Sequence, residues 1–145
     1  MFSREESKQL RHDFWIAFGK SFPHKWILYD TKTKGLSLKF HFGLKKAMVS
    51  IDIEHSDLAR RMELWEKLIS LKSILKEEYL PEAIYKDSFL LENQKEISRI
   101  YVEKSDVSIH NKDTWQETMV FMETRMLLLE AFFVEYRELV GGKFD

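Results

Sequence analysis

The sequence predicts an α+β fold, a single domain over residues 1–145 with an antiparallel sheet packed against helices. Apolar residues at every third or fourth position indicate helices near both ends and in the middle of the chain. Short stretches that alternate between apolar and polar residues indicate strands. Only five Gly and two Pro occur, which argues against disorder and against an all-β fold with many turns. The expected order is α-β-β-β-α-β-β-α.

The first helix begins at Ser3, because Ser3 with Glu6 three residues later forms a capping box. Pro23 ends the helix. The face predicted to be buried repeats every four residues: Leu10, Phe14, Phe18 and Phe22.

Three strands are predicted next, at residues 26–30, 36–42 and 47–54. The last two form a hairpin with Leu44 and Lys45 at its tip. In this register every apolar side chain lies on one face, and a shift by one residue would destroy the match. The predicted pairs are Phe42 with Ala47, Phe40 with Val49, Leu38 with Ile51, and Leu36 with Ile53.

The second half of the chain adds two helices and two strands. A helix is predicted from Ser56 to Tyr79, then strands at 83–92 and 96–103. The last helix starts with Asp113 as N-cap and ends near Val140, where Gly-Gly-Lys follows.

The hairpin carries a polar face with Lys39, His41, Ser50, Asp52 and Glu54. The register separates His41 from Asp52 by about 13 Å along the strands, too far for one shared metal ion. Lys39 lies diagonal to Asp52, at about 7 Å, within reach of a cross-strand ion pair. We therefore expect a solvated or helix-covered face with scattered ionisable groups; a binding surface is the open alternative.

Several chemistries lack the residues they need. The absence of Cys excludes disulfides, thiolate zinc sites and cysteine nucleophiles. The His spacing gives no HExxH motif, and no GxSxG, phosphate-binding or dinucleotide-binding loop occurs. A nuclease of the PD-(D/E)xK type needs a strand in which Lys follows an acidic residue by two positions. In this hairpin the residue two positions after Glu54 is Ser56, not Lys. The sequence thus predicts no catalytic residue, cofactor or metal site.

Arg99 is unusual because it lies inside a predicted strand, on one face with Tyr101 and Glu103. It either forms a structural ion pair with a helix carboxylate or lies on an exposed strand face, or it binds an anion through its planar fork of donors. An enzyme would need a pocket with convergent ionisable groups, for instance around Arg99.

Charge is uneven although the net charge is −1. Residues 20–46 hold seven Lys and one acid, whereas residues 110–145 hold four basic and seven acidic residues. The lysine-rich segment makes a nucleic-acid-binding accessory protein the alternative function. Its candidate contacts are Lys25, Lys32, Lys34, Lys39, Lys45 and Lys46.

The last helix, about 42 Å long, has a wider apolar arc than one sheet contact requires. This predicts a homodimer, and the leading hypothesis is a non-enzymatic protein-interaction module with an unknown protein partner. The candidate interface residues are Phe121, Leu128, Phe132 and Leu139. The charged start of the chain and the lack of an apolar run of roughly 20 residues predict a cytoplasmic protein with no membrane contact.

Three segments, LRHDFWIAFGK, KEISRIYVE and VSIHNKDTWQE, carry a family resemblance. With them the chain resembles the bacterial domain-of-unknown-function family 4268 over essentially its full length. The resemblance implies no established activity, and no catalytic set carries over. It implies mainly packing or scaffold roles for the matching residues, Arg11, Phe14, Trp15, Arg99, Tyr101 and Trp115.

Overall fold

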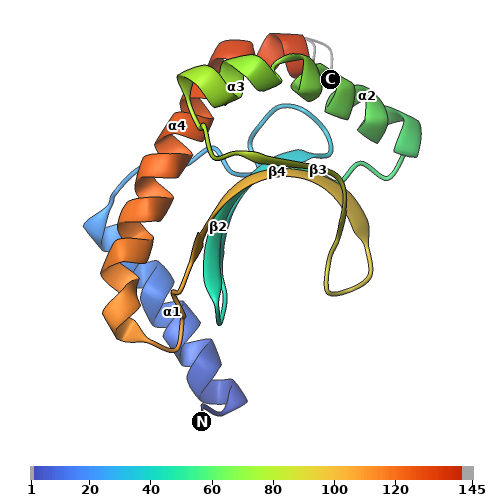
Figure 1. Cartoon of the computed structure of the whole chain (residues 1–145). Helices are drawn as coiled ribbons and strands as arrows, with labels where there is room; N and C mark the ends of the chain where they lie inside the picture. The colour runs from blue at the N-terminus through green and yellow to red at the C-terminus, as the bar shows by residue number, and fades with distance from the viewer. Residues whose placement is uncertain (1, 142–145) are drawn as a thin grey trace.

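A computed structural model describes residues 2–141, which form four α-helices, a 3₁₀ turn and one four-stranded antiparallel sheet (Figure 1). The predicted fold class is confirmed, and the order of elements agrees with the prediction apart from the strand expected at residues 26–30 and the division of the middle helix. In chain order the elements are α1 (Arg4–Ser21), β1 (Leu36–Phe42), β2 (Lys46–Ile53), α2 (Leu58–Ser70), α3 (Lys72–Glu78), β3 (Ile84–Leu90), β4 (Glu96–Ser105), η1 (Lys112–Thr114) and α4 (Trp115–Gly141).

The sheet has the strand order β1-β2-β4-β3. The β1–β2 register is the predicted one in all four apolar pairs. β2 also pairs with β4, which places Asp52 opposite Arg99 and Ser50 opposite Tyr101. This second pairing joins residues 47 positions apart, so the hairpin pattern alone does not reveal it.

The predicted strand at residues 26–30 is wrong, since this segment is irregular chain. Leu28 has a φ of 45°, outside the strand region, and only the bond from Leu38 N to Leu28 O ties the segment to β1. The carboxylate of Glu130 on α4 instead accepts the backbone N–H of Ile27 at 2.6 Å. This segment passes along the edge of the sheet without joining it.

The helix boundaries agree with the prediction at some points and differ at others. The helix predicted over 56–79 is divided at Leu71, whose φ of −101° and ψ of 6° separate α2 from α3. Asp113 is not an N-cap; Asn111 caps the 3₁₀ turn that precedes α4. The Ser3–Glu6 capping box is confirmed. α4 continues through Gly141, and the remaining Gly-Lys of the predicted terminator lie outside the described residues.

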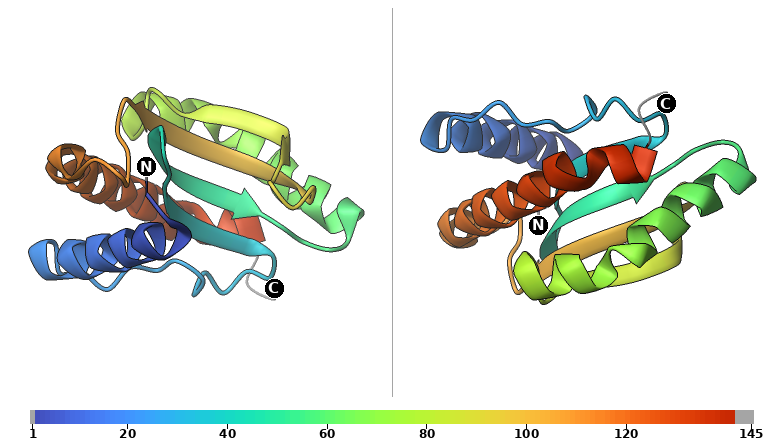
Figure 2. Two further views of the ribbon diagram at one scale, coloured as in Figure 1. Left: turned by 90° about the horizontal axis from the view of Figure 1, so that it is seen from below. Right: turned by 90° about the horizontal axis from the view of Figure 1, so that it is seen from above.

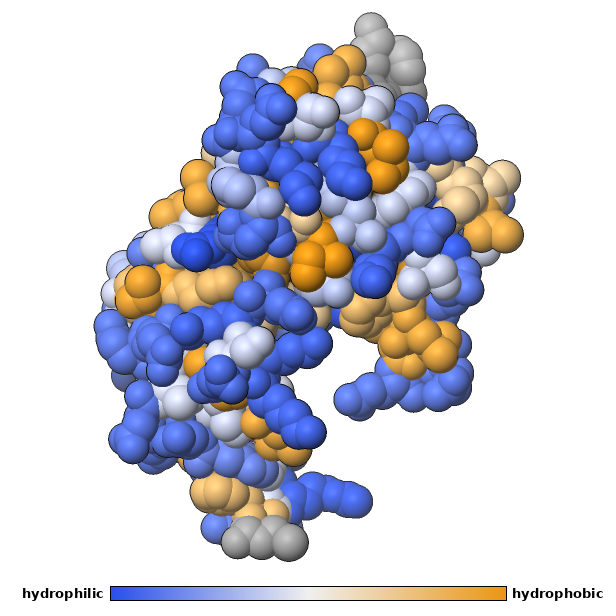
Figure 3. Space-filling model, viewed as in Figure 1, coloured by the Kyte–Doolittle hydropathy of each residue, from blue (hydrophilic) through white to orange (hydrophobic). Residues whose placement is uncertain are grey.

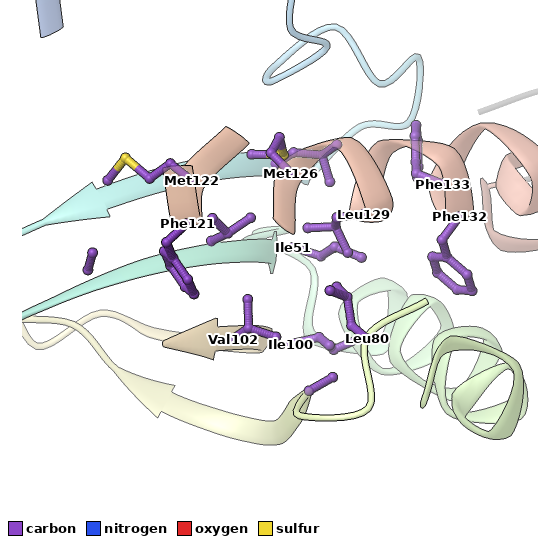
Figure 4. Packing of buried hydrophobic residues seen from close by; sticks show 14 of the residues in the cluster. Ile51, Leu80, Ile100, Val102, Phe121, Met122, Met126, Leu129, Phe132 and Phe133 are labelled. Atoms are coloured by element: carbon purple, nitrogen blue, oxygen red, sulfur yellow. The ribbon is translucent and has the colours of Figure 1, made fainter. Parts of the chain in front are cut away.

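All four helices lie on or beside the convex side of the curved sheet, with α4 between α1 and the α2–α3 pair (Figure 2). The apolar faces of β1, β2 and β4 meet one side of α4 there. Figure 4 shows α4 side chains packed over the strands, with Ile51, Ile100 and Val102 beneath them. This layer forms the core, and it leaves the polar sheet face on the concave side.

Candidate binding site on the concave face of the sheet

The concave side of the sheet forms a hollow beneath the arch of strands (Figures 1 and 3). None of the helices within residues 2–141 covers this side; the β3–β4 hairpin curls over it instead. A cavity of about 490 Å³ lies here, within the size range of ligand sites. Its lining comes from β1, β2, β4 and the β3–β4 hairpin: Lys39, His41, Gly43, Lys46, Met48, Phe89, Leu90, Leu91, Glu92 and Arg99.

A buried ion pair lies beside the cavity. Arg99 Nε donates to Asp52 Oδ1 and Arg99 Nη2 donates to Oδ2, each at 2.8 Å. Asp52 is 0% exposed and Arg99 is 5% exposed. The fork-to-fork geometry follows from the β2–β4 register, which places the two residues directly opposite. The structural reading of Arg99 as an ion-paired residue is thus confirmed, with a partner on a strand rather than on a helix.

The environment of Asp52 keeps it ionised. Burial by itself would raise the pKa of the Asp52 carboxyl, because the charged form loses hydration. The hydrogen bonds and charge of Arg99, with a hydrogen bond from Ser50, outweigh burial and lower this pKa below its usual value. Asp52 is therefore a carboxylate at neutral pH.

Ser50 connects Asp52 to His41. Ser50 Oγ donates to Asp52 Oδ1 at 2.8 Å, and His41 Nε2 lies 3.0 Å from the same hydroxyl. Since the single hydroxyl proton points at Asp52, His41 Nε2 must be the donor to Ser50, and the neutral ring keeps Nδ1 as an acceptor. Burial, together with the charge of Arg99, lowers the pKa of His41 to about 4. His41 is therefore neutral at pH 7.

The expectation of scattered ionisable groups is wrong. His41 and Asp52 are separated along the strands as the register requires, but Ser50 lies between them and hydrogen-bonds to both. Lys39 Nζ lies 3.6 Å from Asp52 Oδ2 and donates to Glu54 Oε2 at 2.6 Å, which confirms the predicted cross-strand ion pair. Neighbouring strands therefore gather these groups into one network.

Phe89 covers the network from the β3–β4 hairpin. Its ring lies 4.3 Å from the guanidinium carbon of Arg99, and it meets the ring of Tyr101 edge-on at 5.8 Å. The β3–β4 register shifts between Lys86 and Phe89, an irregularity that bends a strand. The hairpin thus closes one side of the hollow.

Three cations and one carboxylate, Glu92, contribute to the cavity lining. Lys39, Lys46 and Arg99 pair with Glu54, Glu103 and Asp52, which do not line the cavity. Among the described residues, the one partner of Arg99 Nη1 is the thioether of Met48, at 3.6 Å, and sulfur is a weak acceptor. The cavity therefore has apolar walls and one weakly engaged guanidinium nitrogen, while carboxylates balance the charges of its cations.

Two of the six lysines proposed for nucleic-acid binding line the cavity, and the other four do not. Only Lys39 and Lys46 line the cavity, and both make ion pairs. Lys32 pairs with Asp30 at 2.7 Å. The remaining three, Lys25, Lys34 and Lys45, lie on the irregular segment before β1 and at the hairpin tip.

The predicted dimer residues divide into two groups. Phe121 and Phe132 are 7% and 1% exposed and belong to the core of the chain itself, which corrects the expectation that they lie on a free face. Leu128 and Leu139 are 39% and 64% exposed. The homodimer stays a prediction, without the two phenylalanines.

The described residues hold neither a cluster of metal ligands nor a membrane-spanning helix. Within residues 2–141, no three His, Asp or Glu side chains are placed to hold a metal ion together. Over the same range, the helices are too short or too polar to cross a membrane.

The fold and the hollow define this class of molecule as an α+β domain with a helical layer on one side of a curved antiparallel sheet and a polar cavity on the other. The chain belongs to the family described as domain of unknown function (DUF4268), whose model matches residues 10–137. No curated protein and no solved structure matches the chain.

The residues that carry the family resemblance have different surroundings. Phe14 is fully buried and meets the Trp115 ring edge-on at 5.3 Å, so both are packing residues, as is Tyr101 at 8% exposure. Trp15 is 37% exposed, and Arg11 is exposed as well. A packing role therefore does not extend to Arg11.

Sequence reasoning missed the apolar part of the site. The cavity is also lined by four apolar residues: Met48, Phe89, Leu90 and Leu91. The sequence pattern of the hairpin indicated only its polar residues as candidates. Met48 alternates with Ser50 and Asp52 on the polar face, which was a usable signal of an apolar contact there. For Phe89 no such signal exists, because the register shift in β3 decides its direction.

Proposed function

We propose that this protein is a non-enzymatic binding module whose concave cavity accepts a short peptide segment with a carboxylate beside an apolar side chain. The proposal is supported by an apolar-walled cavity in which one guanidinium nitrogen has a weak acceptor as its partner. Arg99 Nη1, with only a sulfur partner, and the lysines offer donors to a carboxylate, while Met48, Phe89 and Leu91 offer apolar contact.

Catalysis receives less support from the same geometry. Ser50 and Asp52 are both 0% exposed, so neither presents an oxygen to a substrate. His41 Nε2 donates its proton to Ser50, so this nitrogen is not free to accept a proton from a nucleophile. The polar groups thus support a preformed binding surface.

A peptide titration followed by ¹⁵N–¹H NMR spectra tests the proposal. The probes are short peptides with Glu or Asp next to Leu or Phe, and matched peptides with Gln or Asn instead. We expect amide shifts in β1, β2 and the β3–β4 hairpin with the acidic peptides only. Equal shifts with the amide peptides, or none with either set, would contradict the proposal.

A cavity-blocking variant makes this test specific. Gly43 lines the cavity, and a Cβ built there meets only Lys46 O at 3.9 Å, so Gly43→Leu is sterically tolerated. Gly19→Leu is the matched control, since a Cβ on this α1 residue meets nothing within 4 Å. We expect Gly43→Leu to abolish binding and Gly19→Leu to retain it.

The nucleic-acid alternative is tested with the same protein. Labelled DNA and RNA titrated at two salt concentrations would show a steep salt dependence if the lysines bind phosphates. Such binding, without any response to peptides, would replace the peptide proposal by this alternative.

A further inference from the structure

One side of α4 faces away from the sheet (Figure 2) and carries a stripe of exposed apolar residues. Val120, Leu127 and Val134 recur every seven residues and are 43%, 41% and 52% exposed. Thr124, which is half-buried, and Ala131, which is exposed, lie between them and complete a 4-3-4-3 spacing. This spacing is that of a coiled-coil seam.

The side chains and the length of the stripe are suitable for contact with another helix. Thr124 Oγ1 donates to Val120 O at 2.8 Å, so its hydroxyl is satisfied within α4 and its methyl is left for contact. Short side chains at Thr124 and Ala131 allow a second helix to approach closely between the larger residues. From Val120 to Val134 the stripe runs about 21 Å, enough for a partner helix of two to three heptads.

Acidic side chains surround this stripe: Glu117 and Glu138 continue its spacing at the two ends, and Glu123 and Glu135 lie on its two flanks. Within the described part of the chain, Glu117 pairs with Lys104 at 3.1 Å, and the other three make no ion pair. The one cation at the border, Arg137, lies over the Phe133 ring at 5.2 Å.

We propose that this stripe docks a basic amphipathic helix of a different protein, with leucine-like residues in the seam and Lys or Arg on both borders. A second copy of this chain would bring carboxylates to both sides of the seam, where like charges repel. A basic helix meets the same carboxylates with opposite charge. The proposal does not depend on the cavity on the concave side.

Two synthetic 21-residue helical peptides test this docking. Both have Leu at the seam positions; one has Lys and the other Glu at the flanking positions. At about 150 mM salt, where surface charges are screened beyond about 8 Å, we expect the Lys peptide to bind at least about tenfold more tightly. Fluorescence anisotropy of the labelled peptides measures the ratio.

Variants separate docking on the stripe from general attraction between charges. Leu127→Lys should lower the affinity for the Lys peptide at least about tenfold. Leu44→Lys, at the exposed hairpin tip, should leave this affinity unchanged. The triple variant Glu123→Lys/Glu135→Lys/Glu138→Lys should prefer the Glu peptide. Equal affinity for both peptides, no binding, or a wild-type dimer that Leu127→Lys dissociates would each overturn the proposal.

Discussion

Asp52 and Arg99 show how single residues on neighbouring strands determine the character of the concave face. The pair is buried and bidentate, and it also touches Ser50, Lys39 and Phe89. A buried pair of this kind contributes little relative to an apolar replacement, but breaking it leaves one charge buried without a partner. The pair therefore sets the geometry of the site more than it adds to overall stability.

Arg99→Met should destabilise the protein by about 3–5 kcal/mol, because Asp52 stays buried without its partner. The double variant Asp52→Leu/Arg99→Met should recover most of this loss. Urea unfolding measures both free energies. Lys46→Met is the control: its pair with Glu103 is largely exposed, so about 1 kcal/mol or less is expected. Equal small losses for Arg99→Met and Lys46→Met would show that the buried pair does not matter.

His41 makes stability depend on pH. Its pKa is about 4 in the folded protein and near 6.5 in an unfolded chain. Between these values the unfolded chain binds a proton that the folded chain does not, so the free energy of unfolding falls as pH is lowered from 7 to 4. We expect a loss of about 2 kcal/mol, below the full linkage value because His41 keeps partial solvent contact.

His41→Gln should remove this part of the pH dependence, since an amide does not titrate and still donates to Ser50. Urea midpoints at pH 7, 5.5 and 4.5 provide the comparison. His12→Gln, on the exposed side of α1, is the matched variant and should behave as wild type. An unchanged pH profile for His41→Gln would mean that the ring is not buried in neutral form.

At the scale of elements, the sequence correctly predicts the register of the β1–β2 hairpin. It wrongly predicts a strand in the segment before this hairpin. Strict alternation fixes which side chains share a face, so the register of Leu36–Phe42 on Lys46–Ile53 follows from the pattern. The segment 26–30 has strand-like residues, but the buried Glu130 of a distant helix takes the N–H of Ile27. Local propensity cannot reveal a partner 103 positions away.

Glu130→Gln should loosen the segment before β1. The carboxylate accepts from Ile27 N and lies 3.0 Å from His24 Nε2, and an amide satisfies only part of this pattern. A loss of about 1–3 kcal/mol in local stability is expected. Limited trypsin digestion should cleave faster after Lys25 and Lys32, whereas Glu135→Gln on the exposed side of α4 should leave the rate unchanged.

At the scale of the molecule, the curved sheet has two sides with different roles: a convex side that forms the core and a concave side that forms the cavity. The convex side is filled by helices and supplies the core, while the concave side is closed only by the β3–β4 hairpin. Alternation predicts the polar face but not how far a sheet coils, because twist accumulates over all four strands. The gathering of His41, Ser50, Asp52 and Arg99 therefore required the structure.

In the free protein the side chains of the concave face form one preformed, hydrogen-bonded site: His41, Ser50, Asp52 and Arg99. The most direct measurement is the side-chain Nε–Hε signal of Arg99 in ¹⁵N-edited NMR spectra at neutral pH. We predict a distinct signal that exchanges slowly with water and shows contacts to the Phe89 ring. A signal averaged and exchanging as fast as that of the exposed Arg11 would contradict the account.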